Sequence, residues 1–534
     1  MNLRFNRRRI QKDLRFLRSL LLEQLPEKST TLFRTVTQSA LRVVTFLIPL
    51  LVTISLTIVV YMVGFEDVYQ RHINTYTAHR FIFALLSILF IVRLLLLLPK
   101  VGRWRVRIFN FALLLLIFYL RDLAGEIPQL AIGSIELITK KLILFAGVVI
   151  LFFIEVSHIL RFVYRRGVNP AMLFVASFAA FIVLGGFLLL LPNATTGSIH
   201  PIDALFMSAS AVCVTGLTVL DTATGFTPTG QVIILILIQL GGLGIMTFAG
   251  MISFLVTGSI SIQSQVALQG MLSSNRMSNV ISFISRIVLV TFTFEGIGAI
   301  MIYSTLAPDM FDSESRKIFF SIFHSVSAFC NAGFSTLSTG LYDVRLRHNY
   351  NLQWVIGLLV ILGGMGFPIL FNIFVSFRVK IRNTINRIFH FGEHENYTNV
   401  LDATSRLALA TYFILLTMGF VAYFIFEFNH TLREHQSVMG IITTSFFGSV
   451  TPRTAGFGTV DFALFSLPTI MIYLLLMLVG ASPGSTGGGI KTTVAAVAFL
   501  NMKSVVLGHE RTEAFRSEIS TASVKRAFAI ILLA

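Results

Sequence analysis

The sequence predicts an all-α polytopic membrane protein built from repeated units of helix, re-entrant loop and helix. Of its 534 residues, 55% are hydrophobic and only 13% are charged, and the mean hydropathy is +0.81. Apolar runs repeatedly reach the length of about 20 residues that a helix needs to cross a bilayer. A short glycine-containing phrase also occurs three times at nearly constant spacing, which is typical of internal repeats arranged around an axis.

Residues 1–168 precede the first copy of the phrase and form a separate region. Between residues 4 and 42 there are ten Lys and Arg against three acids, without the pattern of a signal peptide. Apolar segments follow near 41–63, 81–99, 108–120 and 141–162. We therefore expect a basic cytoplasmic N-terminus and about four extra transmembrane helices. Arg93, Glu155 and His158 are candidates for an intramembrane pair within this bundle.

The formal net charge of +17 is spread over loops and not gathered in one patch. A cytoplasmic N-terminus also places the Lys and Arg that follow the second span, the fourth span and every later repeat in the cytoplasm, as the positive-inside rule requires. This basicity indicates cytoplasmic loops and not a nucleic-acid interface. The two cysteines, Cys213 and Cys330, are too few for a disulfide framework or a metal site. We expect a multi-pass protein of the inner cell membrane.

From residue 169 the order becomes membrane helix, short helix, glycine phrase and membrane helix. The short helices, expected at 201–212, 316–329 and 436–450, are too short to span a bilayer and indicate re-entrant segments. The second membrane helices are expected at 228–257 and 351–378, and at 465–507 with a long interruption. The resulting domains are repeat one at 169–258, repeat two at 282–380, repeat three at 403–508 and the start of a fourth repeat at 520–534.

The glycine phrases occupy 213–217, 330–334 and 453–457, and their glycines lie 117 and 123 residues apart. Each glycine has a phenylalanine ten residues upstream, at Phe206, Phe323 and Phe446. Carbonyls of a non-helical stretch can replace the hydration shell of a cation, and glycine reaches the backbone angles that this requires. The short helix upstream directs the negative end of its dipole at the same place. The pattern predicts K⁺-channel-like units around a pseudo-fourfold pore, with ion contacts at Cys213, Val214, Thr215, Gly216, Cys330, Asn331, Ala332, Gly333, Thr454, Ala455 and Gly456.

Repeat three carries a polar segment at 480–493, where repeats one and two have only Gly241 and Gly363 in the middle of their second helices. Its proline and glycines cannot sustain a helix, and unpaired backbone groups at that depth require water or ions. We therefore expect this segment beneath the phrases inside the pore, where Lys491 would repel cations until the segment moves. The candidate gating residues are Gly480, Ser482, Gly484, Ser485, Thr486, Gly487, Gly488, Gly489 and Lys491.

A few charged residues lie close to these elements. Glu295 falls in the middle of an apolar span, and a buried hydrogen-bond anchor is favoured there over a cation-binding or regulatory role. Asp221 and Asp461 lie five residues past their glycines and Asp343 ten past. Such acids either concentrate cations at the pore mouth or are ordinary solvated loop residues. Arg453 stands where the other phrases have cysteine, and we expect it to have a structural partner and not to contact an ion.

These motifs together closely resemble the Trk/Ktr/HKT superfamily of potassium transport subunits. The resemblance covers about 169–534. It is carried by the phrases at 212–218, 329–335 and 452–457, by the glycine clusters at 239–244 and 362–368, and most specifically by 484–491, which is similar to the family's intramembrane gating loop.

The resemblance implies a four-repeat pore within a homodimer, and cytoplasmic Rossmann-type regulatory subunits that bind nucleotides. It implies K⁺ as the transported ion, held at the phrase residues, because Gly216 matches the family's K⁺-selective members, whereas a serine there is associated with Na⁺. No covalent cofactor and no nucleic-acid partner are implied, and nothing in the sequence suggests an enzyme. Membrane lipid is the other expected partner, and symport with a second ion stays open. The alternatives are a Na⁺-selective or Na⁺-coupled relative, and a non-conducting membrane scaffold or sensor.

The spacing of the phrases also bears on the end of the chain. A fourth glycine is expected about 115–125 residues past Gly456, beyond residue 534. Residues 523–534 look like the beginning of the first helix of that repeat. The sequence therefore predicts a chain truncated before its fourth repeat, which would not conduct by itself.

Overall fold

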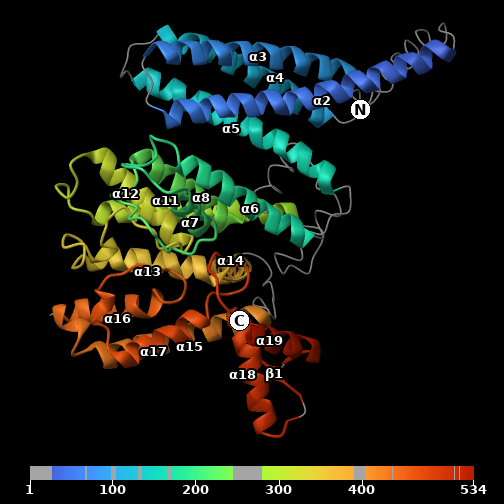
Figure 1. Cartoon of the computed structure of the whole chain (residues 1–534). Coiled ribbons are helices and arrows are strands. Elements are labelled where there is room, and N and C mark those ends of the chain that lie inside the picture. The colour runs from blue at the N-terminus through green and yellow to red at the C-terminus, as the bar shows by residue number, and fades with distance from the viewer. Residues whose placement is uncertain are drawn as a thin grey trace. The chain divides into compact units, whose positions relative to one another are not determined.

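The computed structural model describes most of the chain as helix. The described residues are 27–65, 69–97, 104–129, 135–164, 170–244, 280–389, 403–435, 437–509, 511–515 and 517–533. The expected basic segment before residue 27 and the expected end of the repeat-one helix at 245–257 lie outside them. The chain divides into two compact units near Phe162, and each is described here by itself (Figure 1).

The N-terminal unit is a bundle of four helices. They are α2 Glu27–Gly64, α3 Tyr69–Leu97, α4 Trp104–Glu126 and α5 Ile135–Tyr164, with a 3₁₀ turn η1 at Ile127–Gln129. Ile48, Phe83 and Leu144 are fully buried between them. The expected pair is present, with Arg93 Nη1 3.5 Å from Glu155 Oε1, whereas the side chain of His158 is outside the described residues. The short third span expected at 108–120 forms the longer helix α4.

The second unit contains three successive sets of helix, short helix and helix, drawn from green to orange in Figure 1. Repeat one consists of α6 Pro170–Leu189, α7 Pro201–Val212 and α8 Pro228–Leu243. Repeat two consists of α11 Val280–Thr305, α12 Glu314–Phe329 and α13 Tyr350–Met365. Repeat three consists of α15 Ala403–Glu427, α16 Val438–Val450 and α17 Leu467–Leu478. The remaining elements are α14 Phe367–Phe389, α18 Thr492–Val506, α19 Thr521–Leu533, β1 Glu513–Ala514, β2 Ser517–Glu518, η3 Gly340–Tyr342, η4 Thr431–Glu434 and η5 Phe462–Leu464.

The short helices α7, α12 and α16 end at the residues that the sequence predicted. Two of them begin at serine N-caps, because Ser313 accepts a hydrogen bond from the N–H of Arg316 and Ser437 accepts one from the N–H of Gly440. α7 begins at Pro201, which suits the first helical position because it has no N–H to leave unpaired. Each helix therefore has a defined start, and its C-terminal end points to the following glycine phrase.

The expectation of an unbroken second helix is wrong for repeat two, whereas the expected continuation of the repeat-one helix past residue 244 lies outside the described residues. α13 ends at Gly366, which has a φ of 87°, and α14 continues at an angle of 100°. α8 ends at Gly244, which has a φ of 71°. Gly241 and Gly363 therefore lie near the ends of these helices and not in their middle. Glycine with a positive φ is a common helix stop, and at Gly366 it redirects the chain from α13 into α14.

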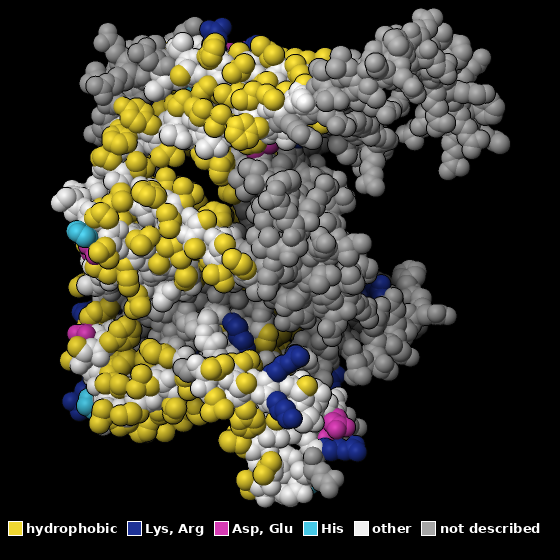
Figure 2. Space-filling model, turned by 45° about the vertical axis from the view of Figure 1, so that its right-hand side comes forward, with side chains coloured by type: hydrophobic (Ala, Val, Ile, Leu, Met, Phe, Trp, Pro, Cys, Tyr) yellow, Lys and Arg dark blue, Asp and Glu magenta, His cyan; other side chains and the backbone are white. Residues whose placement is uncertain are grey.

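The lateral surface of the second unit is apolar. Phe187, Leu289, Ile414 and Leu474 are each more than half exposed, and Figure 2 shows hydrophobic side chains covering the described helices while most charged side chains gather towards their ends. Among the described residues, five helices are long and apolar enough to cross a membrane, or six if the bent pair α13 and α14 is one span. An apolar surface of this extent fits lipid and not water.

Candidate functional site: the glycine phrases and the polar segment

The three glycine phrases share one backbone conformation. A residue other than glycine comes first in each with a positive φ: Val214 55°, Asn331 58° and Thr454 70°. A glycine follows two residues later: Gly216 80°, Gly333 71° and Gly456 76°. This alternation turns successive peptide groups towards one side of the backbone, which a regular strand does not do. A residue other than glycine in the left-handed region costs about 1–2 kcal/mol, and such strain is typical of functional sites.

The phrases also lie against one another. A Cβ atom placed on Gly216 would be 2.4 Å from the carbonyl oxygen of Ala332, and one on Gly333 would be 2.7 Å from the carbonyl oxygen of Ala455. Glycine is therefore required at these positions for two reasons: the positive φ disfavours any other residue, and the neighbouring phrase leaves no space for a side chain. Three segments far apart in the sequence thus bring their backbone carbonyls to one place.

A repeated hydrogen bond, which the sequence analysis missed, holds each short helix to the first helix of its repeat. The serine hydroxyls donate to main-chain carbonyls: Ser208 to Ile182 at 2.7 Å, Ser325 to Glu295 at 2.6 Å and Ser449 to Leu416 at 2.5 Å. A glycine one turn further along the first helix gives each serine room, at Gly185, Gly298 and Gly419. Ser208 and Ser325 lie eight residues before their phrase glycines and Ser449 lies seven before, and this nearly constant spacing was the signal in the sequence that could have revealed them.

The upstream phenylalanines keep their spacing but not their environment. Phe323 is fully buried and Phe206 is 41% exposed, whereas Phe446 stacks on Trp354 with ring centroids 4.3 Å apart. They therefore mark the register of the repeats and do not form a common set of contacts.

The residue that opens each phrase differs in its surroundings. Cys213 is exposed and Cys330 is buried. Arg453 is 3% exposed, and its guanidinium donates to the carbonyl oxygens of Tyr412 at 3.2 Å and Gly480 at 3.3 Å. It also lies 3.8 Å from the centroid of the Tyr412 ring. The expected structural partner of Arg453 is thus present, and it joins phrase three to the polar segment.

The polar segment is non-helical between α17 and α18, as the sequence predicted, but it ends at Lys491, because the last two residues of the predicted range already belong to α18. Its two ends pair with each other, because the N–H of Gly480 donates to Ile490 and the N–H of Ala481 donates to Gly488. Lys491 Nζ donates to the carbonyl oxygen of Gly487 at 2.6 Å. The positive charge of Lys491 therefore interacts with a backbone carbonyl of the polar segment itself.

The polar segment lies against phrases two and three. Thr486 Oγ1 is 3.2 Å from the carbonyl oxygen of Phe329 and 3.0 Å from the side-chain amide of Asn331. A Cβ atom on Gly487 would be 2.4 Å from Thr454 Oγ1. The segment also reaches the break in repeat two, where the N–H of Phe367 donates to Gly484. These contacts place Thr486 and Gly487 directly next to the phrases.

The acids past the phrases are occupied by local hydrogen bonds. Asp221 accepts from the N–H of Ala223 and the hydroxyl of Thr224, each at 2.9 Å. Asp461 accepts from the N–H of Ala463. Asp343 pairs with Arg345, which lowers the pKa of that carboxyl. The contacts favour loop-capping roles for all three.

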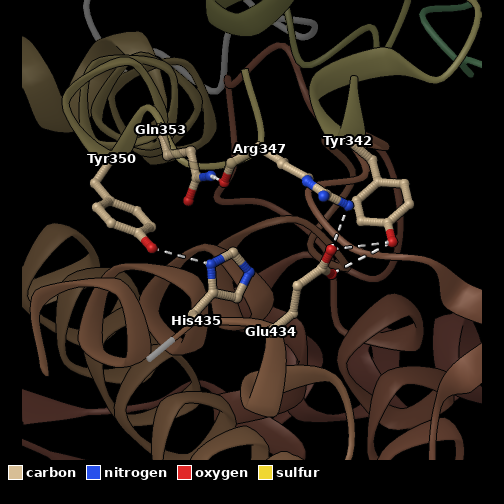
Figure 3. Close-up of polar contacts among 6 residues, drawn as sticks. All are labelled: Tyr342, Arg347, Tyr350, Gln353, Glu434 and His435. Carbon is tan, nitrogen blue, oxygen red and sulfur yellow. Dashed lines mark hydrogen bonds and ion pairs between the residues drawn. The ribbon is translucent and has the colours of Figure 1, made fainter. Parts of the chain in front are cut away.

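A polar cluster joins the loop before α13 of repeat two to the loop before α16 of repeat three and was also missed from the sequence (Figure 3). Glu434 pairs with Arg347 and accepts a hydrogen bond from Tyr342. The hydroxyl of Tyr350 lies 3.2 Å from His435 Nδ1. Because these residues come from loops far apart in the sequence, no local pattern predicts the contact.

The apolar spans, the re-entrant helices and the phrases that meet at one place define a polytopic membrane protein of the pore-loop class. The family model described as "TrkH: Cation transport protein" matches residues 142–532. The potassium/sodium uptake protein NtpJ of Enterococcus hirae is 34% identical over 69% of this chain and 77% of its own length. The Ktr system potassium uptake protein B of Bacillus subtilis is 35% identical over 68% of this chain and 76% of its own.

The fold agrees with these sequence matches. The crystal structure of the potassium transporter TrkH from Vibrio parahaemolyticus superimposes with a TM-score of 0.52 at 18% identity, over 80% of this chain and 83% of that one. The chain belongs to the TrkH cation transport family, and it is a membrane protein of potassium transport and not an enzyme.

Proposed function

We propose that this protein takes up K⁺ across the cell membrane through a selectivity filter formed by the backbone carbonyls of its glycine phrases. The observation that carries this proposal is the backbone shared by the three phrases, together with their mutual approach. Rings of oriented carbonyls replace the hydration shell of K⁺ in pore-loop proteins. The potassium uptake relatives support the same ion.

The polar segment is the proposed gate. Its hydrogen bonds run to phrase two, to phrase three and to the break between α13 and α14. A segment held by a few exchangeable hydrogen bonds can leave without unfolding a helix, which suits a moving element. In this state it blocks the route below the phrases, and its displacement opens that route.

The protein works as a homodimer in the inner membrane, surrounded by lipid, with its N-terminus in the cytoplasm. Cytoplasmic Rossmann-type subunits bind the regulatory nucleotide, and no covalent cofactor takes part. A membrane potential supplies about 2.3 kcal/mol per charge for each 100 mV, which concentrates K⁺ without chemical catalysis. Symport with a second ion would add to this driving force.

The test is the substitution Gly216→Ser in the full-length protein, expressed in a bacterium that lacks its own K⁺ uptake. The serine side chain would crowd the carbonyl of Ala332 and oppose the φ of 80°. We expect K⁺ uptake to lose at least about tenfold of its preference over Na⁺, measured as competition between ⁸⁶Rb⁺ and Na⁺. An unchanged preference would contradict the filter assignment.

A Na⁺-transporting or Na⁺-coupled protein is the second candidate. It is favoured by one relative, which is named a potassium/sodium uptake protein. Uptake of ²²Na⁺ that exceeds that of ⁸⁶Rb⁺ in the same cells, or ⁸⁶Rb⁺ uptake that requires Na⁺, would support it. A non-conducting scaffold would show neither flux.

A further inference from the structure

The first helix of repeat two carries an acid where the other two repeats carry apolar residues. The repeated serine hydrogen bonds make Ile182, Glu295 and Leu416 equivalent positions. The side chain of Glu295 is nonetheless buried, since the residue is only 5% exposed. A carboxyl group at this depth is costly, so it requires polar partners.

The Glu295 carboxyl faces one polar group from each of two repeats. The thiol of Cys330, at the start of phrase two, donates to Glu295 Oε1 with a distance of 3.8 Å. The side-chain amide of Gln239, on α8 of repeat one, faces the same carboxyl. Its nitrogen is enclosed and has no hydrogen bond of normal geometry among the described residues. The positions two residues before Gly363 and Gly480, which match Gln239, hold Ile361 and Leu478.

Cys330 also packs against α8. A Cβ atom on Gly242 would lie 2.4 Å from Cys330 Sγ, so α8 leaves no space behind the thiol. Cys330 caps α12 and directly precedes Asn331, whose φ is 58°. A displacement of Cys330 is therefore passed through the backbone to Asn331 and Gly333.

We propose that Glu295, together with Gln239, is a positioning residue that sets ion selectivity by holding Cys330 and thereby the peptide groups of phrase two. Glu295 acts through hydrogen bonding and does not contact the ion. The inference rests on the proposed function of the phrases as a selectivity filter. It also assigns phrase two a support that differs from that of phrase three, where Arg453 bonds the carbonyls of Tyr412 and Gly480.

The test compares Glu295→Leu, which introduces the residue of repeat three, with Glu295→Gln, which keeps a hydrogen-bonding side chain of the same length. Glu427→Gln is the matched control, because Glu427 is a buried acid on the first helix of repeat three whose carboxylate binds Thr431 and Ser466. ⁸⁶Rb⁺ uptake is measured against increasing Na⁺ in cells and in proteoliposomes. We expect Glu295→Leu to lose about five- to tenfold in preference for Rb⁺ over Na⁺, while the two glutamine variants stay within about twofold of the wild type.

A second measurement does not depend on transport. In a Cys213→Ala background, labelling by a membrane-permeant maleimide reports on Cys330 alone. Glu295→Leu should speed this labelling by about fivefold or more, because Cys330 loses its hydrogen-bond partner. Should Glu295→Leu fail to accumulate, Cys330→Ala removes the same contact and should show the same loss of selectivity.

The inference is overturned if Glu295→Leu or Cys330→Ala transports with wild-type preference, or if labelling of Cys330 is unchanged. It is also overturned if Glu295→Gln is as defective as Glu295→Leu, since charge and not hydrogen bonding would then be required. A wild-type protein that carries no Rb⁺ would refute the proposed function itself, which is a distinct result.

Discussion

At the scale of single residues, glycine meets two different requirements in each repeat. Gly333 needs a left-handed φ of 71°, whereas Gly298 sits in the helix α11 and needs only space. A Cβ atom there would be 2.5 Å from Ser325 Oγ and 2.7 Å from Leu359 Cδ1. The corresponding glycines, Gly185 and Gly419, meet a serine and a leucine in the same way. This three-way contact ties the short helix to both long helices.

We expect Gly298→Ala to destabilise the protein by about 1–3 kcal/mol, because the added methyl group overpacks the contact between α11, α12 and α13. Gly296→Ala is the control, since a Cβ atom at Gly296 has no neighbour within 4 Å. Thermal unfolding in detergent should show a lower midpoint for Gly298→Ala alone. Equal midpoints for the two variants would refute the packing argument.

At the scale of elements, the polar segment takes the place of the end of a helix. α8 and α13 continue to Gly244 and Gly366, whereas α17 ends at Leu478 and the segment folds back on itself. Its pairing of Val479 with Ile490 closes the loop. The loop is thus a compact element held to its surroundings by a small number of hydrogen bonds, and Thr486 makes the contact with phrase two.

We expect Thr486→Val to weaken the closed position, because valine has the shape of threonine without its hydroxyl. ⁸⁶Rb⁺ uptake under conditions that keep the wild-type protein closed should rise by about fivefold. Thr417→Val is the control, since that hydroxyl bonds only within α15, to the carbonyl oxygen of Phe413. A decrease of uptake in Thr486→Val would contradict a blocking role for the segment.

At the scale of the whole molecule, repeats two and three are joined at the phrases and again at the loops that hold Arg347 and Glu434. His435 lies at the second junction, where it is almost fully buried. Burial and the nearby charges of His348 and Arg347 lower the pKa of His435, although Glu434 acts in the opposite direction. The hydroxyl of Tyr350 is its hydrogen-bond partner. The neutral imidazole is therefore the form that this junction holds.

We expect the folded protein to lose stability as the pH falls below about 6.5, the ordinary pKa of histidine. In this range the unfolded chain binds a proton at His435 that the folded protein excludes. The neutral His435 contributes fully to the free energy of unfolding above the ordinary pKa of histidine. This contribution is lost as the pH falls from there through the lowered pKa that His435 has in the folded protein. His435→Gln should flatten the decrease in unfolding midpoint between pH 7.5 and 5.0. Parallel curves for both proteins would show that His435 is not the group responsible.

The sequence by itself determined the class of this protein and the position of its main elements. Hydropathy is a property of the local sequence, and so is the requirement for glycine at a left-handed turn. These two signals were enough to predict where most spans, the short helices and the three phrases lie along the chain. The same signals marked 480–493 as non-helical and Arg453 as a residue in need of a partner.

Only the tertiary structure decided how these elements meet. α13 ends where the polar segment packs against it, since the N–H of Phe367 donates to Gly484 and the N–H of Ser482 donates to Gly364, so an apolar run of 20 residues or more was misleading there. The contacts of Glu295 with Cys330 and of Arg347 with Glu434 join residues 35 and 87 positions apart. The first contact depends on packing within repeat two and the second on packing between repeats two and three, and a single sequence holds no periodicity that encodes either.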